Sequence, residues 1–133
     1  MMNTYTFLQK FYNNTIRYFS NGVGCDYYGY GNWGFHNVIS SNTIVDNDLG
    51  IYVWTLYDNN TIENNYIRNI QMTNSSSLGW AGIYIKSEAN YWARNTSITN
   101  NTILSHRGPG ILIDNSEDLT VKNNKITVQT PKQ

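Results

Sequence analysis

The chain has 133 residues, a formal net charge of zero and only 14% charged residues, so it fits one domain without the basic surface that nucleic-acid binding requires. Its single cysteine, Cys25, excludes an internal disulfide framework, and no apolar run is long enough to cross a bilayer. The first residues also lack the charged and then apolar pattern of a secretory signal. We therefore expect neither nucleic acid nor a membrane as partner, while the compartment is left open, with extracellular, cell-surface and virion locations all compatible.

Taken in chain order, the sequence predicts many short strands and no helix. Residues 1–12 alternate loosely and predict an incomplete first coil or a cap, residues 13–128 form repeats, and residues 129–133 form a tail. In each repeat, two runs rich in β-branched residues flank an asparagine step, and a third run begins with glycine. The runs beside the asparagine steps cover residues 15–18, 43–45, 61–63, 66–70, 97–99, 102–104 and 119–122. The glycine-led runs cover residues 22–26, 50–54, 82–86 and 110–114.

The spacing of the asparagine steps predicts the architecture. The intervals between successive turn asparagines are 28, 23, 36 and 23 residues, measured at Asn14, Asn42, Asn65, Asn101 and Asn124. The repeated value indicates the bare coil, and the longer intervals exceed it by 5 and 13 residues that fall beside glycine-led runs. Constant coils with variable loops on one side are typical of a solenoid. Three strands per coil predict an all-β parallel β-helix of four to five coils, with the stacked asparagines forming an amide ladder.

The N-N-x-I turn followed by G-I-x-I is similar to the repeat of the right-handed parallel β-helix in the pectate-lyase-like superfamily, over roughly residues 13–128. The resemblance implies a right-handed β-helix. The members of this superfamily include polysaccharide lyases, polygalacturonase-like hydrolases, alginate epimerases, phage tailspikes and non-catalytic repeat proteins. Its enzymes bind extended sugar chains along the glycine-led sheet. The paired-aspartate, Gly-His-Gly, Arg-x-Lys and Asp-Pro-His-Glu motifs of the hydrolases and epimerases are absent from this sequence.

Aromatic residues gather on the glycine-led strands and in the loops next to them. Because side chains alternate along a strand, the third and fifth residues of each glycine-led strand are expected to point outward. Flat rings suit the apolar faces of sugars, so we expect a polysaccharide as partner. The candidate sugar-binding residues are Tyr52, Trp54, Tyr84, Trp33, Trp80, Tyr91 and Trp92. The alternative is that the loops fold over the sheet and bury these rings in a satellite core.

Charged residues near the same face are the candidates for catalysis. Lys86 and Asp114 are the fifth residues of neighbouring glycine-led strands, so they form either a base and acid pair or an ordinary surface ion pair. His106 and Arg107 precede the fourth glycine-led strand. There, arginine would bind a uronate carboxylate and histidine would shuttle a proton, unless both belong to a solvated turn. A catalytic chain would be a polyuronate lyase, an epimerase or a glycoside hydrolase, and the sequence leaves enzymatic activity undecided.

We expect no cofactor, with one alternative in the polar turn Asp46-Asn47-Asp48, where Asp46 and Asp48 are candidate calcium ligands. Three neighbouring residues fall short of the six to eight oxygens that Ca²⁺ prefers. The leading interpretation is a polysaccharide-binding β-helix, and the alternatives are a catalytic module and a structural solenoid such as part of a phage tail or surface protein. Neither end has a convincing cap, which predicts that a second copy or further coils of a longer chain cover the ends.

Overall fold

The computed structural model describes residues 10–17, 21–25, 36–47, 49–54, 59–69, 81–87, 94–105 and 108–128. These residues contain fourteen β-strands, and every pairing between the strands is parallel. Within these same ranges, no helix has the length and apolarity needed to cross a membrane.

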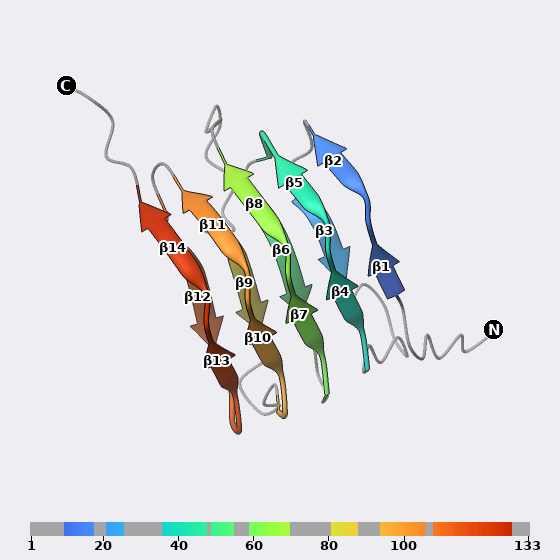
Figure 1. The fold of residues 1–133 in the computed structure, drawn as a ribbon. Coiled ribbons are helices and arrows are strands. Elements are labelled where there is room, and N and C mark those ends of the chain that lie inside the picture. Colours follow the sequence, from blue (N-terminus) through green and yellow to red (C-terminus); the bar gives the residue numbers. More distant parts are fainter. Residues whose placement is uncertain are drawn as a thin grey trace, which may run out of the picture.

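The strands form three sheets, each built from every third strand of the chain (Figure 1). Sheet 1 contains β1 (Lys10–Tyr12), β4 (Val38–Ser40), β7 (Thr61–Glu63), β10 (Ser97–Thr99) and β13 (Thr120–Lys122). Sheet 2 contains β2 (Thr15–Arg17), β5 (Thr43–Val45), β8 (Tyr66–Asn69), β11 (Thr102–Ser105) and β14 (Lys125–Val128). Sheet 3, the glycine-led sheet, contains β3 (Asn21–Cys25), β6 (Leu49–Trp54), β9 (Ile83–Lys86) and β12 (Ile111–Asp114).

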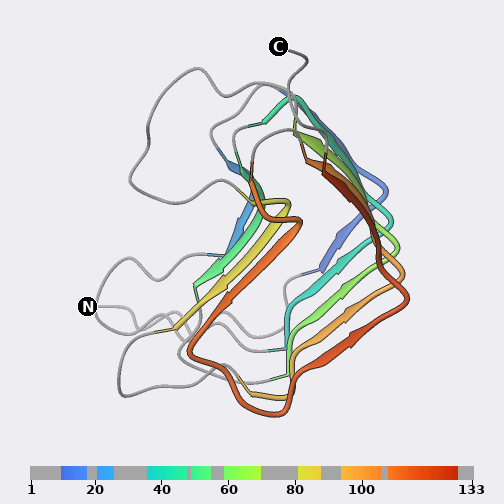
Figure 2. The same ribbon diagram turned by 90° about the vertical axis from the view of Figure 1, so that its left-hand side faces the viewer.

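One rung is a consecutive set of strands from sheets 1, 2 and 3. Rung 1 is β1–β2–β3, rungs 2 to 4 follow in order, and rung 5 comprises β13 and β14 among the described residues. Figure 2 looks along the stack and shows sheet 3 facing the angle made by sheets 1 and 2. The structure therefore has the predicted architecture of a parallel β-helix. Rung 1 begins at Lys10, so the first three described residues already belong to sheet 1.

The interior is filled by columns of β-branched residues that stack from rung to rung. Sheet 2 contributes the isoleucine that follows each asparagine step, and its inner members are almost completely buried: Ile44, Ile67 and Ile103. Sheet 1 contributes a matching column of Ile39, Ile62 and Ile98, and sheet 3 contributes Ile51, Val53, Ile83 and Ile85. Full burial of one such side chain stabilises a fold by about 1.5–3 kcal/mol. Because these columns repeat from rung to rung, short strands are sufficient to form a continuous core.

The predicted asparagine ladder runs along the bend between sheets 1 and 2. In each step, the backbone N–H and the Nδ2 of one asparagine donate to Oδ1 of the next, as Asn42 does to Asn65 at 3.0 and 3.1 Å. The residue before each ladder asparagine has a left-handed backbone, with φ between 53 and 57°: Asn13, Ser41, Asn64, Asn100 and Asn123. Asparagine and serine are short polar residues, and asparagine in particular tolerates this conformation. The ladder thus fixes a sharp bend at the same place on every rung.

Candidate functional site

The outer face of sheet 3 is the candidate site, and its register follows the predicted columns. Tyr52 pairs with Tyr84, which pairs with Leu112, to form the third-position column. Trp54 pairs with Lys86, which pairs with Asp114, to form the fifth-position column. The alternating residues Ile51 and Val53, with their counterparts on β9, belong to the interior core. The third-position side chains, and Lys86 and Asp114 of the fifth-position column, therefore lie on the outer face of the sheet.

The tyrosines of the third-position column are covered. Tyr52 is 1% exposed and Tyr84 is 9% exposed. Their ring centroids lie 5.5 Å apart with the planes tilted by 43°, a separation typical of favourable aromatic pairs. They form a second apolar cluster, separate from the interior core, with Leu49, Ala81 and Leu112. This differs from the exposed aromatic surface expected from the sequence, and it makes the tyrosine pair a support for the sheet.

The direction of the glycine positions explains part of this difference. A Cβ on Gly82 would meet Ile103 Cγ2 and would lie 2.6 Å from the carbonyl oxygen of Gly110, so this position faces the interior. The residues before Gly50 and Gly82, Leu49 and Ala81, join the outer cluster. The signal in the sequence was the apolar residue that precedes glycine in L-G-I-Y and A-G-I-Y.

The fifth-position column carries the charge of this face. Lys86 is half-buried and Asp114 is exposed, and their Cα atoms are directly opposite each other on β9 and β12. Just beyond these strands, the buried Ser87 hydroxyl donates a hydrogen bond to the carbonyl oxygen of Asn115. This bond ties the end of β9 to the end of β12. The two charged residues thus lie on adjacent rungs, as the sequence predicted, and a hydrogen bond just beyond them joins these rungs.

Asp114 also affects the pKa of Tyr84, which lies on the neighbouring strand β9. Burial raises the pKa of Tyr84 above its usual value of 10.0, and the negative charge of Asp114 raises it further. Both effects favour the neutral phenol, since burial and a nearby negative charge each penalise the phenolate. The phenol of Tyr84 therefore stays protonated, and this residue offers a hydrogen-bond donor to its surroundings.

We expect the raised pKa of Tyr84 to make the protein less stable at alkaline pH. The folded state holds the phenolic proton more tightly than the unfolded chain, so this stability is fully present below the unfolded pKa and is lost as the pH rises through the folded pKa. Tyr84→Phe should remove this loss. Urea unfolding midpoints at about pH 9 and about pH 11 would measure it. An equal loss in the variant and the wild type would contradict the assignment.

Several predicted site residues lie outside the described residues: Trp33, Trp80, Tyr91, Trp92, His106, Arg107 and Asp48. Trp54 is described through its backbone alone, which occupies the last position of β6. Their roles as sugar-binding, catalytic or metal-binding residues stay predictions.

The calcium candidate Asp46 lies in a turn that the solenoid itself requires. Its φ is 58°, and its backbone N–H donates to the carbonyl oxygen of Arg68 on the next rung at 2.8 Å. The adjacent Asn47 is buried, and its Nδ2 donates to the carbonyl oxygens of Ile16 and Val45. Across the ranges that the structure describes, no three His, Cys, Asp or Glu side chains are grouped as metal ligands would be. The geometry gives Asp46 a structural role, and calcium binding stays a prediction.

Three sheets of parallel strands, an asparagine ladder and in-register surface columns define a β-helix solenoid. A family model described as "Right handed beta helix region" matches residues 3–130, and the chain belongs to this family. The match confirms the predicted right-handed β-helix. No match was found among curated proteins or among solved structures.

Proposed function

We propose that the chain is a polysaccharide-binding β-helix module that holds an extended glycan across the rungs of sheet 3. The observation that carries the proposal is the fifth-position column, in which Trp54, Lys86 and Asp114 follow one another in register on three successive rungs. Parallel strands repeat every ~4.8 Å, about the length of one monosaccharide in an extended chain. Each rung would therefore meet one sugar.

The chemistry of the column suits a sugar chain. The Asp114 carboxylate accepts hydrogen bonds from hydroxyl groups, while the Lys86 ammonium donates to hydroxyl or uronate oxygens. Lysine side chains pack their stems on apolar surface and keep the charge near water, which fits the half-buried state of Lys86. The buried Tyr52–Tyr84 pair lies beside this column and stiffens the sheet, and a rigid surface loses little conformational entropy on binding.

Affinity electrophoresis through gels containing acidic or neutral polysaccharides tests the proposal. We expect retardation by at least one polysaccharide, with no gain in unsaturated products or reducing ends when the protein is incubated with the same panel. Cleavage would replace the binding function with the catalytic alternative, for which Lys86 and Asp114 are the described candidates. Absence of retardation across the panel would contradict polysaccharide binding.

We expect Lys86→Ala to weaken binding to an acidic polysaccharide about tenfold, since one lost charge-assisted hydrogen bond corresponds to about 1.4 kcal/mol or more. Arg68→Ala is the matched control. Arg68 is exposed on the same rung, but it belongs to β8 of sheet 2, so its removal subtracts the same charge away from the proposed site. An equal loss in both variants would mean that net charge, and not the sheet 3 column, determines binding.

A further inference from the structure

The core columns of sheets 1 and 2 end in partly or largely exposed apolar side chains on the first and last described rungs. On rung 5, Val121 and Ile126 are 45% and 44% exposed, although they continue the sheet 1 and sheet 2 columns. Their neighbours one rung earlier, Ile98 and Ile103, are 0% and 1% exposed. On rung 1, the equivalent Phe11 and Ile16 are partly buried and pack against the core. The last described rung thus exposes the two columns, and Phe11 and Ile16 occupy the same columns on the first.

The asparagine ladder makes the two ends chemically different. Asn101 donates from its backbone N–H and its Nδ2 to Oδ1 of Asn124, both at 3.0 Å. Among the described residues no further rung follows Asn124: its Nδ2 donates to the carbonyl oxygen of Ile98 at 2.8 Å, and its second Nδ2 hydrogen and its backbone N–H have no ladder partner there. At the other end, no described rung precedes Asn14 to donate to its Oδ1. One end therefore offers hydrogen-bond donors and the other offers the matching acceptor.

We propose that the C-terminal end of one molecule docks on the N-terminal end of a second copy and extends the β-helix head to tail. Strand β13 would pair with β1 of the second copy, and β14 would pair with β2, in the same parallel register that joins the rungs within one chain. Val121 and Ile126 would then be covered by the second copy's Phe11 and Ile16. Asn124 would donate to the second copy's Asn14 and continue the ladder. Open strand edges next to apolar residues are the usual template for such pairing.

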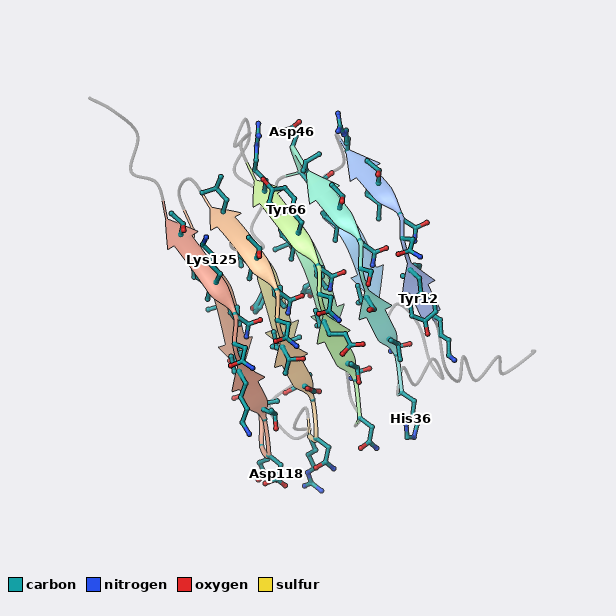
Figure 3. All side chains as sticks on the ribbon, in the orientation of Figure 1. Tyr12, His36, Asp46, Tyr66, Asp118 and Lys125 are labelled. Atoms are coloured by element: carbon teal, nitrogen blue, oxygen red, sulfur yellow. The ribbon has the colours of Figure 1, made fainter. Side chains whose placement is uncertain are left out.

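The charged residues of the two ends are compatible with this register. Continuing sheet 1 by one rung places Lys122 opposite Tyr12, and Thr120 opposite Lys10. Continuing sheet 2 places Lys125 opposite Thr15, and Thr127 opposite Arg17. Figure 3 shows Tyr12 and Lys125 at opposite ends of the stack. No two cations are directly opposite each other, so direct like-charge pairs, which destabilise neighbouring strands, are avoided.

The polarity of the ladder also selects the type of association. If two C-terminal ends met, the donors of Asn124 would face donors, and the parallel register would be lost. The head-to-tail contact uses two different surfaces of each molecule, and a contact of this kind leads to open chains unless its rotation closes a ring. This assembly does not depend on polysaccharide binding at sheet 3.

Two complementary variants test the inference. Ile126→Lys places a charge in the C-terminal surface, and Ile16→Lys places one in the N-terminal surface. We expect the mass of the wild type to rise with concentration in analytical ultracentrifugation, each variant alone to stay monomeric, and an equimolar mixture to form dimers and nothing longer. Dimers in the mixture require one intact end from each variant, which is the signature of a head-to-tail contact.

Two results would overturn the inference. A wild type that stays monomeric at all concentrations would show that the ends do not bind a second copy. Self-association of the Ile16→Lys variant alone would show that two C-terminal ends bind each other. Far-UV circular dichroism checks that each variant is folded, and Val121→Lys with Phe11→Lys is a second pair that probes the same surfaces through sheet 1.

Discussion

Replacing Asn65 with alanine is expected to lower the free energy of unfolding by about 3–5 kcal/mol, because it leaves several buried polar groups without partners. The Asn65 side chain accepts hydrogen bonds from the backbone N–H and Nδ2 of Asn42 at 3.0 and 3.1 Å. It donates to the carbonyl oxygen of Ile39 at 2.9 Å and to Oδ1 of Asn101 at 3.0 Å. Asn65 is buried, so water cannot replace these partners without opening the bend. Urea unfolding followed by circular dichroism would measure the change.

Asn14→Ala is the matched control at the exposed end of the same ladder. The Asn14 side chain makes one ladder contact among the described residues, from its Nδ2 to Oδ1 of Asn42 at 3.0 Å, and the residue is exposed. Its loss should cost about 1 kcal/mol, the usual net value of a single hydrogen bond. Dilute protein keeps both measurements free of association. If the two variants lost equal stability, the buried ladder would not be the source of the effect.

The ladder was predictable because spacing alone determines it. Asparagines that recur at the same point of a 23-residue coil must stack if the strands pair in parallel, whatever the loops between them do. The longest interval, between Asn65 and Asn101, shows this independence: the two residues still form the same hydrogen bonds across 36 positions of chain. The register of Lys86 with Asp114 followed from the same repeat.

The burial of the outer tyrosines was not predictable from the repeat. Alternation gives the direction of a side chain relative to its sheet, and it does not say what covers the sheet from outside. Tyr52 and Tyr84 point outward as predicted, yet they are buried in the cluster with Leu49 and Ala81. The predicted sugar-binding and catalytic residues of the loops follow no period at all, so the repeat predicts which strands they lie near and not their positions. The positions of residues within the repeat can therefore be predicted from the sequence, whereas those of residues in the loops cannot.

Gly82→Ala is expected to destabilise the protein by about 3 kcal/mol, the upper part of the usual range for an overpacked core. The added methyl group would lie 2.6 Å from the carbonyl oxygen of Gly110 and would also meet Ile103 Cγ2. The carbonyl belongs to the backbone of the next rung and accepts a hydrogen bond from the Ile83 N–H at 2.9 Å, so it cannot move without disturbing the stack. Urea unfolding midpoints of the variant and the wild type would measure the loss.

Gly110→Ala separates crowding between rungs from any general effect of replacing glycine. The three atoms nearest to a methyl group on Gly110 would all belong to the side chain of Ile126, which lies on the last described rung and is 44% exposed. That side chain has room to move, so the cost should be about 1 kcal/mol, at the low end of the range for overpacking. Neither glycine has the left-handed φ that disfavours alanine, so left-handed backbone strain arises in neither variant. Equal losses at the two positions would contradict the explanation, whereas a larger loss at Gly82 would show that close stacking of the next rung is what requires glycine there.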